Sequence, residues 1–208
     1  MILIGQFDSS FTRRIGMALT LYGLPFEHRP WSVFGDAEKI RPLNPLVRVP
    51  TLVLDDGEVL VETFPILDHI DSLVPEAKRL CPSAGPMRRK VLNISALAGG
   101  AADHCVSLFY LRAMHREVSA DLQARRLSQI NGTLDALEAA RAKAVSPWFF
   151  GESLTHADIA VTASLRHITD SLPQFISLGK RPALAAHCAA CEAMPVFQDI
   201  SQAFIAPA

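Results

Sequence analysis

The sequence lacks the features that mark several large classes of protein. No uninterrupted apolar run approaches membrane-spanning length, and the opening Met1-Ile2-Leu3-Ile4 has no basic leader, so we expect neither a membrane span nor a signal peptide. The formal net charge is only −1, which gives no reason to expect nucleic acid or an anionic membrane as a partner. Neither H-E-x-x-H nor G-x-S-x-G occurs, which disfavours a zinc protease and a serine hydrolase. A soluble, cytoplasmic protein is therefore predicted.

Cysteine is scarce, with four residues in the whole chain. Cys188 and Cys191 form a C-x-x-C, but they lie in an alanine-rich helical stretch with no strand leading into it, which disfavours a redox motif. His187 and Cys191 would share a helix face, yet no further ligand has metal-site spacing. Buried small side chains are the favoured role, and no metal is predicted. The first loop contains no cysteine, which disfavours a glutaredoxin-like activity.

The composition predicts a folded protein. Half of the 208 residues are hydrophobic and a fifth are charged, which is ample material for the core of one large or two small domains. Basic pairs are scattered along the chain, and the simplest interpretation places them on solvated faces of helices. These pairs are Arg13-Arg14, Arg88-Arg89 and Arg125-Arg126.

Hydrophobic periodicity divides the chain into two unlike halves. The first half predicts the order β-α-β-α-β-β-α, with strands at 2–6 and 26–30, after Pro50, and at 59–61, which implies a mixed four-stranded sheet. From Pro86 onward the pattern is helical, and the prolines and glycine just before it mark a linker. We therefore predict one domain over residues 1–74, a linker over 75–86 and an all-α domain over 87–208.

Val49-Pro50, directly before the apolar run 51–54, is the most informative single feature. Proline has no N–H to give a sheet, so it suits the first residue of a strand or the turn that leads into it. A cis bond would turn the chain sharply and leave the backbone N–H and C=O of Val49 free to hold an extended peptide ligand. An ordinary trans proline at a strand edge is the commoner alternative.

Two polar pairs lie where loops lead into predicted helices. Glu62-Thr63 places a carboxylate and a hydroxyl at a strand-to-helix junction, where the first helical N–H groups favour an anion. An amino-acid head group, with its ammonium and carboxylate, would suit that junction. The alternative is that Thr63 caps the helix and Glu62 is solvated. Ser9-Ser10 in the first loop leaves a similar choice between a helix cap and a hydroxyl that faces a ligand.

The helical half carries two signals of its own. Thr155 and Asp158 have capping-box spacing ahead of an apolar stretch, with Asp in place of the usual Glu or Gln, and such a cap contributes about 1 kcal/mol. Gly99 and Gly100 lie inside a helical pattern, where each costs about 1 kcal/mol relative to alanine. Close approach of another helix or of a ligand would explain that cost, and a simple kink is the alternative.

Taken in order along the chain, these segments resemble those of the soluble glutathione transferases. The matching segments are 8–14 (Asp-Ser-Ser-Phe-Thr-Arg-Arg), 44–50 (Asn-Pro-Leu-Val-Arg-Val-Pro), Glu62-Thr63 and 151–158 (Gly-Glu-Ser-Leu-Thr-His-Ala-Asp). Each is weak alone, but they are specific as a set. The chain is most similar to bacterial members with a serine in the first loop. Ser10 stands where many relatives have proline, and Thr63 where serine is usual.

The resemblance implies a fold and an activity. The fold would be a thioredoxin-like glutathione-binding domain followed by an all-helical domain. The activity would be that of a glutathione transferase, which activates the thiol of glutathione for attack on a small, hydrophobic electrophile; peroxidase and isomerase variants are compatible. Ser9 or Ser10 would face the sulfur, since a hydroxyl that donates to sulfur at a helix N-terminus stabilises the reactive thiolate. A non-catalytic glutathione-binding or regulatory protein of the same fold is the alternative.

The resemblance also implies how glutathione is held. Glu62 and Thr63 would bind the γ-glutamyl head, Val49 beside a cis-Pro50 would pair its backbone with the cysteinyl unit, and Arg48 is a candidate for the glycyl carboxylate. A homodimer and a role in detoxification are expected. The electrophile would lie between the first loop and the helices after Met87. Candidates for that wall are Phe11, His104, Cys105, Leu108, Phe109 and Leu111.

Overall fold

The first half of the chain builds one small mixed sheet. A computed structural model describes residues 1–115 and 118–205. The strands are β1 (Ile2–Ile4), β2 (Glu27–Arg29), β3 (Thr51–Val53) and β4 (Val59–Val61), and they lie in the order β2-β1-β3-β4. β1 runs parallel to β2 and antiparallel to β3, and β3 runs antiparallel to β4. The predicted mixed four-stranded sheet is confirmed.

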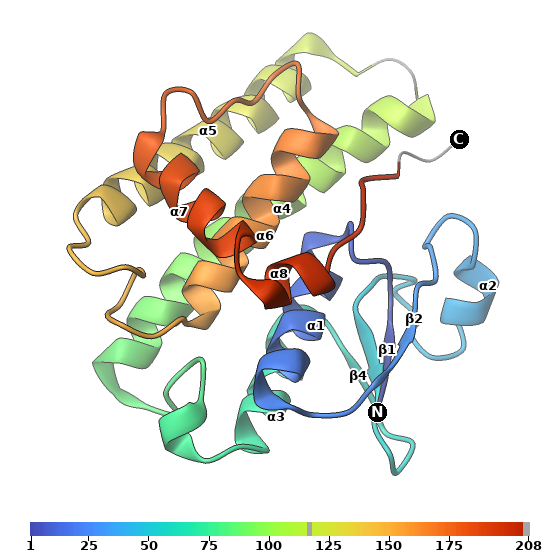
Figure 1. The fold of residues 1–208 in the computed structure, drawn as a ribbon. Helices are drawn as coiled ribbons and strands as arrows, with labels where there is room; N and C mark the ends of the chain where they lie inside the picture. Colours follow the sequence, from blue (N-terminus) through green and yellow to red (C-terminus); the bar gives the residue numbers. More distant parts are fainter. Residues whose placement is uncertain (116–117, 206–208) are drawn as a thin grey trace.

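Helices flank this sheet. α1 (Ser10–Tyr22) and α3 (Thr63–Ser72) pack against each other between the sheet and the helical half, while the short α2 (Ala37–Ile40) lies on the far side (Figure 1). α1 buries Ile15, Ala18 and Leu19 completely, as the apolar spacing of this segment predicts. Its N-terminus therefore lies at a fixed place beside the end of β1.

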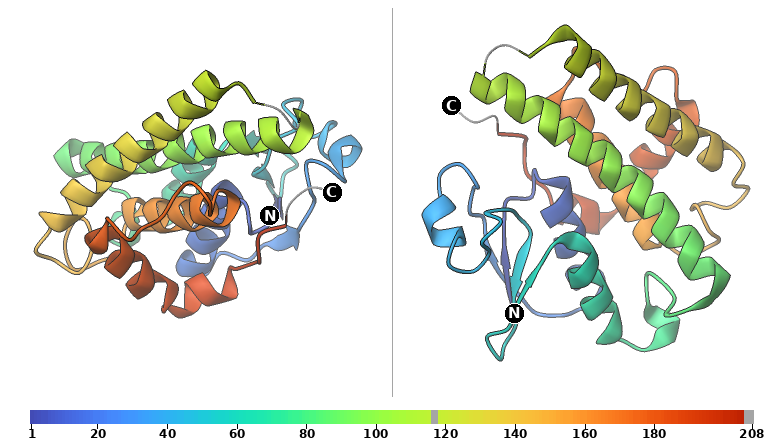
Figure 2. Two further views of the ribbon diagram at one scale, coloured as in Figure 1. Left: turned by 90° about the horizontal axis from the view of Figure 1, so that it is seen from above. Right: turned by 180° about the vertical axis from the view of Figure 1, so that it is seen from behind.

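The second half is helical. Its elements are η1 (Glu76–Lys78), α4 (Gly85–His115), α5 (Ala120–Ala142), α6 (His156–Ser171), α7 (Pro182–Glu192) and α8 (Pro195–Asp199). The long α4 and α5 lie side by side (Figure 2), and α6 packs against α4, α7 and also α1. α6 is thus the central helix of this half and its main contact with the first half. The predicted all-helical region is confirmed.

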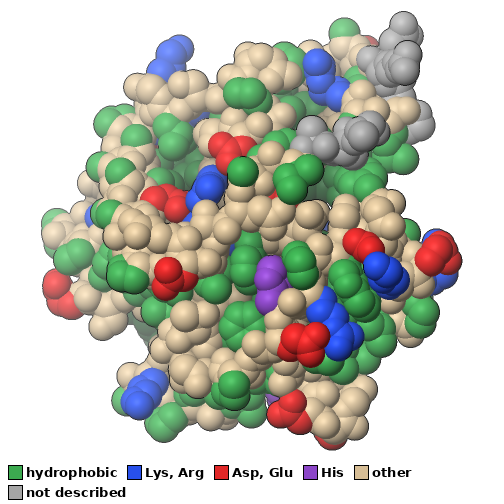
Figure 3. Space-filling view, turned by 45° about the vertical axis from the view of Figure 1, so that its right-hand side comes forward, with side chains coloured by type: hydrophobic (Ala, Val, Ile, Leu, Met, Phe, Trp, Pro, Cys, Tyr) green, Lys and Arg blue, Asp and Glu red, His purple; other side chains and the backbone are tan. Residues whose placement is uncertain are grey.

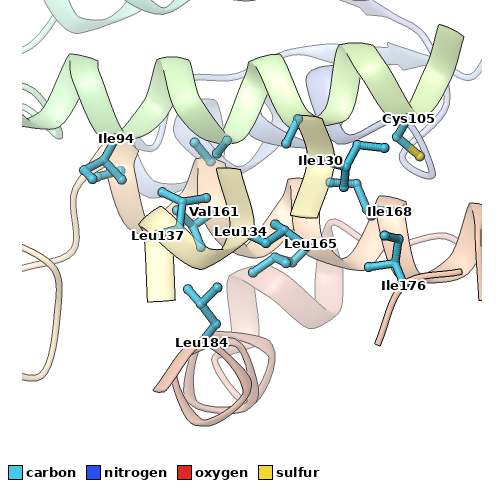
Figure 4. Packing of buried hydrophobic residues seen from close by; sticks show 14 of the residues in the cluster. Ile94, Cys105, Ile130, Leu134, Leu137, Val161, Leu165, Ile168, Ile176 and Leu184 are labelled. Atoms are coloured by element: carbon cyan, nitrogen blue, oxygen red, sulfur yellow. The ribbon is translucent and has the colours of Figure 1, made fainter. Parts of the chain in front are cut away.

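Two apolar cores hold the molecule together. One lies between α4, α5, α6 and α7, where Ile130, Leu134, Val161 and Leu165 meet (Figure 4). The other lies under the sheet and is shared between the halves, because residues from α6 to α8 pack against β1, α1 and α3. Its members from the helical half include Ile159, Ala163, Cys191, Val196, Phe197 and Ile200.

The expectation that Arg13 and Arg14 lie on a solvated helix face is wrong. Arg13 is 2% exposed, donates to the backbone carbonyls of Ile200 and Phe197, and makes a bidentate ion pair with Glu192. Arg14 is 7% exposed. Charge runs are solvated when a helix has a free face, but α1 is enclosed by the sheet on one side and by α6 and α8 on the other.

Among the described residues, α4 is the one helix that is long and apolar enough to cross a membrane, judged by length and composition alone. The core helix of a folded domain passes the same test. Ala98, Cys105 and Leu108 of α4 are buried in the helical core.

Candidate functional site

The site begins where the first loop meets the turn at Pro50. Gly5, directly after β1, has φ +129°, and a Cβ there would lie 2.4 Å from Thr12 Oγ1 and 2.8 Å from Val49 Cβ. Only glycine allows both approaches. The absence of a side chain at Gly5 therefore brings the turn at Val49 against the first turn of α1.

Ser9 is the N-cap of α1. Its Oγ accepts a hydrogen bond from the backbone N–H of Thr12 at 3.4 Å. This interaction uses a lone pair of the oxygen, so the hydroxyl proton stays available for another acceptor. Capping and facing a ligand, which the sequence presents as alternatives, are therefore compatible at Ser9. Ser10 is different, since it is 1% exposed and its Oγ has no partner among the described residues.

Ser9 lies on the wall of a cavity of about 610 Å³, called here the first-loop cavity. This cavity lies between the first loop, the turn at Val49, α4, α6 and the carboxyl-terminal segment. Figure 3 views the molecule from the side of α2 and that segment, and hydrophobic side chains gather on this face. The lining residues are Gln6, Asp8, Ser9, Phe11, Trp31, Ser32, Val33, Phe34, Gly35, Val47, Arg48, Val49, Val106, Phe109, Tyr110, His167, Phe204 and Ile205.

The Val49–Pro50 peptide bond is cis. Pro50 is buried, whereas Val49 is half-buried on the wall of the first-loop cavity. The N–H and C=O of Val49 have no hydrogen-bond partner among the described residues. The structure therefore leaves a donor and an acceptor of one residue at the edge of the sheet, the arrangement that pairs with an extended peptide.

Glu62 and Thr63 lie at the start of α3. Glu62 has φ 66°, ψ 146°, a left-handed conformation that costs a non-glycine residue about 1–3 kcal/mol and is concentrated at functional sites. Glu62 is the N-cap but makes no side-chain capping bond. Thr63 is 7% exposed and its Oγ1 has no partner among the described residues. The alternative in which Thr63 caps this helix is therefore wrong.

Arg48 joins two carboxylates. Its guanidinium lies 3.4 Å from Glu62 Oε1 and 3.2 Å from Asp103 Oδ1 on α4. All three side chains are about half exposed, so each pair contributes little to stability, about 0–1 kcal/mol. The cluster places Asp103, a carboxylate of the helical half, beside Arg48 and Glu62, two of the residues predicted to hold glutathione. Sequence reasoning missed Asp103, which has no motif around it.

The predicted wall of the electrophile site is partly wrong. Phe11 and Phe109 line the first-loop cavity, but Cys105 and Leu108 are fully buried between α4, α5 and α6, and Cys105 points into that core (Figure 4). His104 faces α5, where its Nδ1 lies 3.1 Å from Arg126. Leu111 does not line the cavity. The α4 residues that do line it are Val106, Phe109 and Tyr110.

The carboxyl-terminal strap, residues 201–205, closes one side of the first-loop cavity. Ile205 N–H donates to Asp8 Oδ2 at 3.1 Å, and the N–H of Phe7 donates to Gln202 Oε1 at 3.2 Å. Phe204 packs edge-on against Phe109, with ring centroids 5.3 Å apart. No sequence signal marked this strap, because its contacts join residues nearly 200 positions apart.

Two polar groups lie among the aromatic side chains of this cavity. His167 Nδ1 donates to the backbone carbonyl of Asp8 at 3.0 Å, and burial lowers the pKa of His167, so the ring is neutral. Burial raises the pKa of Tyr110, which keeps its hydroxyl protonated. The Tyr110 hydroxyl can donate or accept a hydrogen bond without bringing charge into the cavity. The neutral His167 ring has given its one N–H to Asp8, so its Nε2, 3.5 Å from Ser171 Oγ, can only accept.

The sheet order, the cis-proline turn beside a capped helix N-terminus and the helical second half define a thioredoxin-like binding domain joined to an all-α domain. The family model for the glutathione S-transferase N-terminal domain matches residues 3–78, and the model for the C-terminal domain matches residues 120–190. The chain belongs to the glutathione S-transferase superfamily. The predicted superfamily, fold and class of enzyme are confirmed.

Individual relatives support this assignment. A GST-like protein of Escherichia coli, YibF, is 30% identical over 141 residues, which cover 66% of this chain and 68% of that protein. Maleylacetoacetate isomerase of Mus musculus is 26% identical over 77% of this chain and 74% of its own length. A glutathione S-transferase of Methylobacterium radiotolerans, in complex with glutathione sulfonate, superimposes with a TM-score of 0.88 at 26% identity, over all of this chain and 98% of that one.

Proposed function

We propose that the protein activates the thiol of glutathione and adds it to an uncharged, hydrophobic electrophile held in the first-loop cavity. The observation that carries the proposal is the position of Ser9, which lines this cavity at the N-terminus of α1. Glutathione as co-substrate agrees with the glutathione sulfonate bound to the Methylobacterium relative.

Ser9 supplies the activation. A free thiol has a pKa near 8.5, so only a few per cent is thiolate at pH 7, and thiolate is the nucleophile. The Ser9 hydroxyl donates to the sulfur, and the unpaired N–H groups of the first turn of α1 favour the negative charge. Lowering the thiol pKa by about two units corresponds to roughly 2.7 kcal/mol. Ser10, which is buried and does not line the first-loop cavity, takes no part.

The rest of the tripeptide extends from the sulfur toward α3. The backbone of Val49 pairs with the cysteinyl unit beside Pro50, and Thr63 receives the γ-glutamyl carboxylate. The γ-glutamyl ammonium then takes the place of Arg48 at Glu62. This exchange of ion pairs frees the Arg48 guanidinium, half exposed at the rim, for the glycyl carboxylate.

The charge of the first-loop cavity separates the proposed substrate from a dicarboxylate. Its described lining includes Phe11, Trp31, Phe34, Phe109 and Phe204, and its one permanent cation, Arg48, is already paired. A maleylacetoacetate-type substrate carries two carboxylates and would leave at least one unpaired in an apolar cavity, at a cost of several kcal/mol. An uncharged aromatic electrophile instead gains stacking contacts.

A conjugation assay tests the proposal. We expect turnover of glutathione with an activated aryl halide such as 1-chloro-2,4-dinitrobenzene, and no isomerisation of maleylacetoacetate under the same conditions. Calorimetric titration with glutathione is run in parallel. Binding of glutathione without turnover of aryl halides, epoxides, peroxides or disulfides would favour the non-catalytic alternative.

A further inference from the structure

A second cavity, called here the interhelical cavity, lies between α1, α3 and α4 and has a volume of about 390 Å³. It begins at Glu62 and Asp103 and runs along α4 to the first residue of α6, His156. Its apolar wall is formed by Leu67 and Leu92. Apart from Phe11, Glu62 and Thr63, the residues that line it have no role in the proposed reaction.

Arg14 is the unusual charge in this cavity. The side chain of Arg14 makes no hydrogen bond or ion pair with any described residue, and its Nε is buried without a partner. Burial lowers its pKa to about 10, so it is still a cation at neutral pH. The other charged side chains of the cavity are paired: Asp68 with Arg88, Asp71 with Tyr22 and His156, and Glu62 and Asp103 with Arg48.

A buried guanidinium without a bonded anion is costly, because the cation has lost its hydration. The carboxylate of Asp103 attracts Arg14 and partly opposes the fall in its pKa, but Asp103 makes its ion pair with Arg48. Two hydroxyl groups of residues that line the same cavity also lack partners. Ser95 on α4 and Thr63 on α3 are each 7% exposed, line the cavity and have hydroxyls without partners among the described residues. One guanidinium and two hydroxyls match the acceptor oxygens of a carboxylate.

The glycines of α4 leave space for such a group. A Cβ on Gly99 would make only ordinary contact with Arg14, 3.6 Å from its Nη1, and a Cβ on Gly100 would meet nothing within 4 Å. Close approach of another helix of this chain, one of the explanations the sequence offered for this pair, is therefore wrong. Both glycines line the interhelical cavity, and side chains there would fill it.

We propose that the interhelical cavity is a carboxylate-binding site in which Arg14 is the cation and Ser95 and Thr63 are the hydrogen-bond donors. Two kinds of ligand supply such a carboxylate. One is the γ-glutamyl carboxylate of glutathione, which rests on the proposed function and adds Arg14 and Ser95 to it. The other is a free carboxylic acid that binds while glutathione occupies Thr63; Arg14 and Ser95 then hold its carboxylate, and its apolar body lies against Leu67 and Leu92.

Calorimetry on the full chain distinguishes the sources. The first arm compares glutathione with 4-aminobutanoyl-cysteinylglycine, the analogue that lacks the γ-glutamyl carboxylate. The second arm titrates benzoate, with benzyl alcohol as the uncharged control, into protein saturated with glutathione. If the group belongs to glutathione, Arg14→Gln weakens glutathione at least tenfold and leaves the analogue unchanged. If it belongs to a free acid, Arg14→Gln abolishes benzoate binding and spares glutathione.

A second variant keeps the test decisive if Arg14→Gln does not fold. Gly100→Leu fills the cavity and leaves every donor in place. It should therefore weaken the binding of the same ligand, glutathione or benzoate, that Arg14→Gln weakens. Gly100→Ala, which fills little, and Gly132→Leu on α5, outside both cavities, are the matched controls. Unchanged glutathione and benzoate binding in Gly100→Leu would overturn the proposal. Wild-type turnover of the aryl halide would still stand, so the two proposals fail separately.

Discussion

Ser9 and Ser10 are adjacent in the sequence but lie in different surroundings. Ser9→Ala should raise the apparent pKa of the glutathione thiol in the complex and lower kcat at neutral pH. Glutathione affinity should change little, because thiolate stabilisation acts on reactivity more than on binding of the whole tripeptide. Ultraviolet thiolate absorbance of the complex, followed against pH, measures this shift. Ser10→Ala is the matched control and should retain the wild-type profile; the reverse result would move the role to Ser10.

Glu62 should decide the affinity for glutathione. In the proposed function the carboxylate of Glu62 faces the γ-glutamyl ammonium, so Glu62→Gln should weaken binding more than tenfold in calorimetric titration, since a partly desolvated charge pair contributes more than a surface pair. Arg48→Ala should weaken binding less, because its target carboxylate lies nearer solvent. Glu58→Gln, in the exposed turn between β3 and β4, is the control. Equal affinities for wild type and Glu62→Gln would contradict the assignment.

At the scale of single residues, the sequence predicts which residues belong to the site better than it predicts how each of them is buried or how its backbone is bent. Glu62-Thr63 and Val49-Pro50 can be recognised in the sequence because each motif consists of neighbouring residues at the start of a predicted helix or strand. The sequence does not predict the burial of Arg14, because its side chain extends to Gly99 of α4, 85 positions away in the chain. The left-handed backbone at Glu62 is equally hidden, since glutamate has no preference for it.

The sequence predicts that a helix exists more readily than it predicts which side of the helix faces the core, and α4 shows why. α4 is apolar on two sides, one turned to the helical core and one to the first-loop cavity. Cys105 and Leu108 lie on the first side, and Val106 and Tyr110 on the second. Hydrophobicity alone cannot assign these faces, because a core and an apolar binding cavity require the same residue types.

The N-terminus of α6 is stabilised by more than a cap. Thr155 and Asp158 form the predicted capping box, and the fully buried Asp158 also accepts a hydrogen bond from the N–H of Phe149 at 2.8 Å. Asp158→Ala should therefore cost about 3 kcal/mol, the sum of a lost cap and a buried N–H left unpaired. Thr155→Ala should cost about 1 kcal/mol. Urea denaturation compares the two, and equal midpoints would count against the second role of Asp158.

His187 on α7 should make stability depend on pH. Burial lowers its pKa to about 4, and Arg141 Nε donates to its Nδ1 at 3.2 Å, while Asp158 lies 3.6 Å from its Nε2 and opposes the shift. The folded state thus binds the proton less readily than the unfolded chain, whose histidine has a pKa near 6.5. This contribution is complete above pH 6.5 and is lost as pH falls toward 4. His187→Gln should reduce the change of the denaturation midpoint with pH over that range. An unchanged pH dependence in this variant would show that His187 is not its cause.

The whole molecule unfolds, we expect, as one unit. The core under the sheet is completed by α6 to α8, and Arg13 joins α1 to Glu192 and to the carbonyls of Phe197 and Ile200. Urea transitions followed by circular dichroism and by tryptophan fluorescence should therefore coincide. A fragment of residues 1–84 should not fold, because it exposes half of a shared core. Two separated transitions, or a folded fragment, would contradict this expectation.

Domain boundaries at 74, 75–86 and 87 stay a prediction, as do the homodimer, the cytoplasmic location and a role in detoxification. Limited proteolysis tests the boundaries, and sedimentation velocity at micromolar concentration tests the dimer. Sequence predicts the division into halves well, because a change from strand to helix periodicity is local. It does not predict that the halves share a core, because that depends on contacts between residues more than 100 positions apart.

The carboxyl-terminal strap, residues 201–205, also has a consequence for the rate of product release. Ile205 and Gln202 are hydrogen-bonded to the first loop, and Phe204 packs edge-on against Phe109. If the protein forms the proposed conjugate, these contacts would have to break before a bulky product leaves. Under the proposed function, we expect product release to be the slow step for large electrophiles and not for small ones. The turnover rate would fall with the size of the conjugate and with solvent viscosity, and the strap would set how long each product resides on the enzyme.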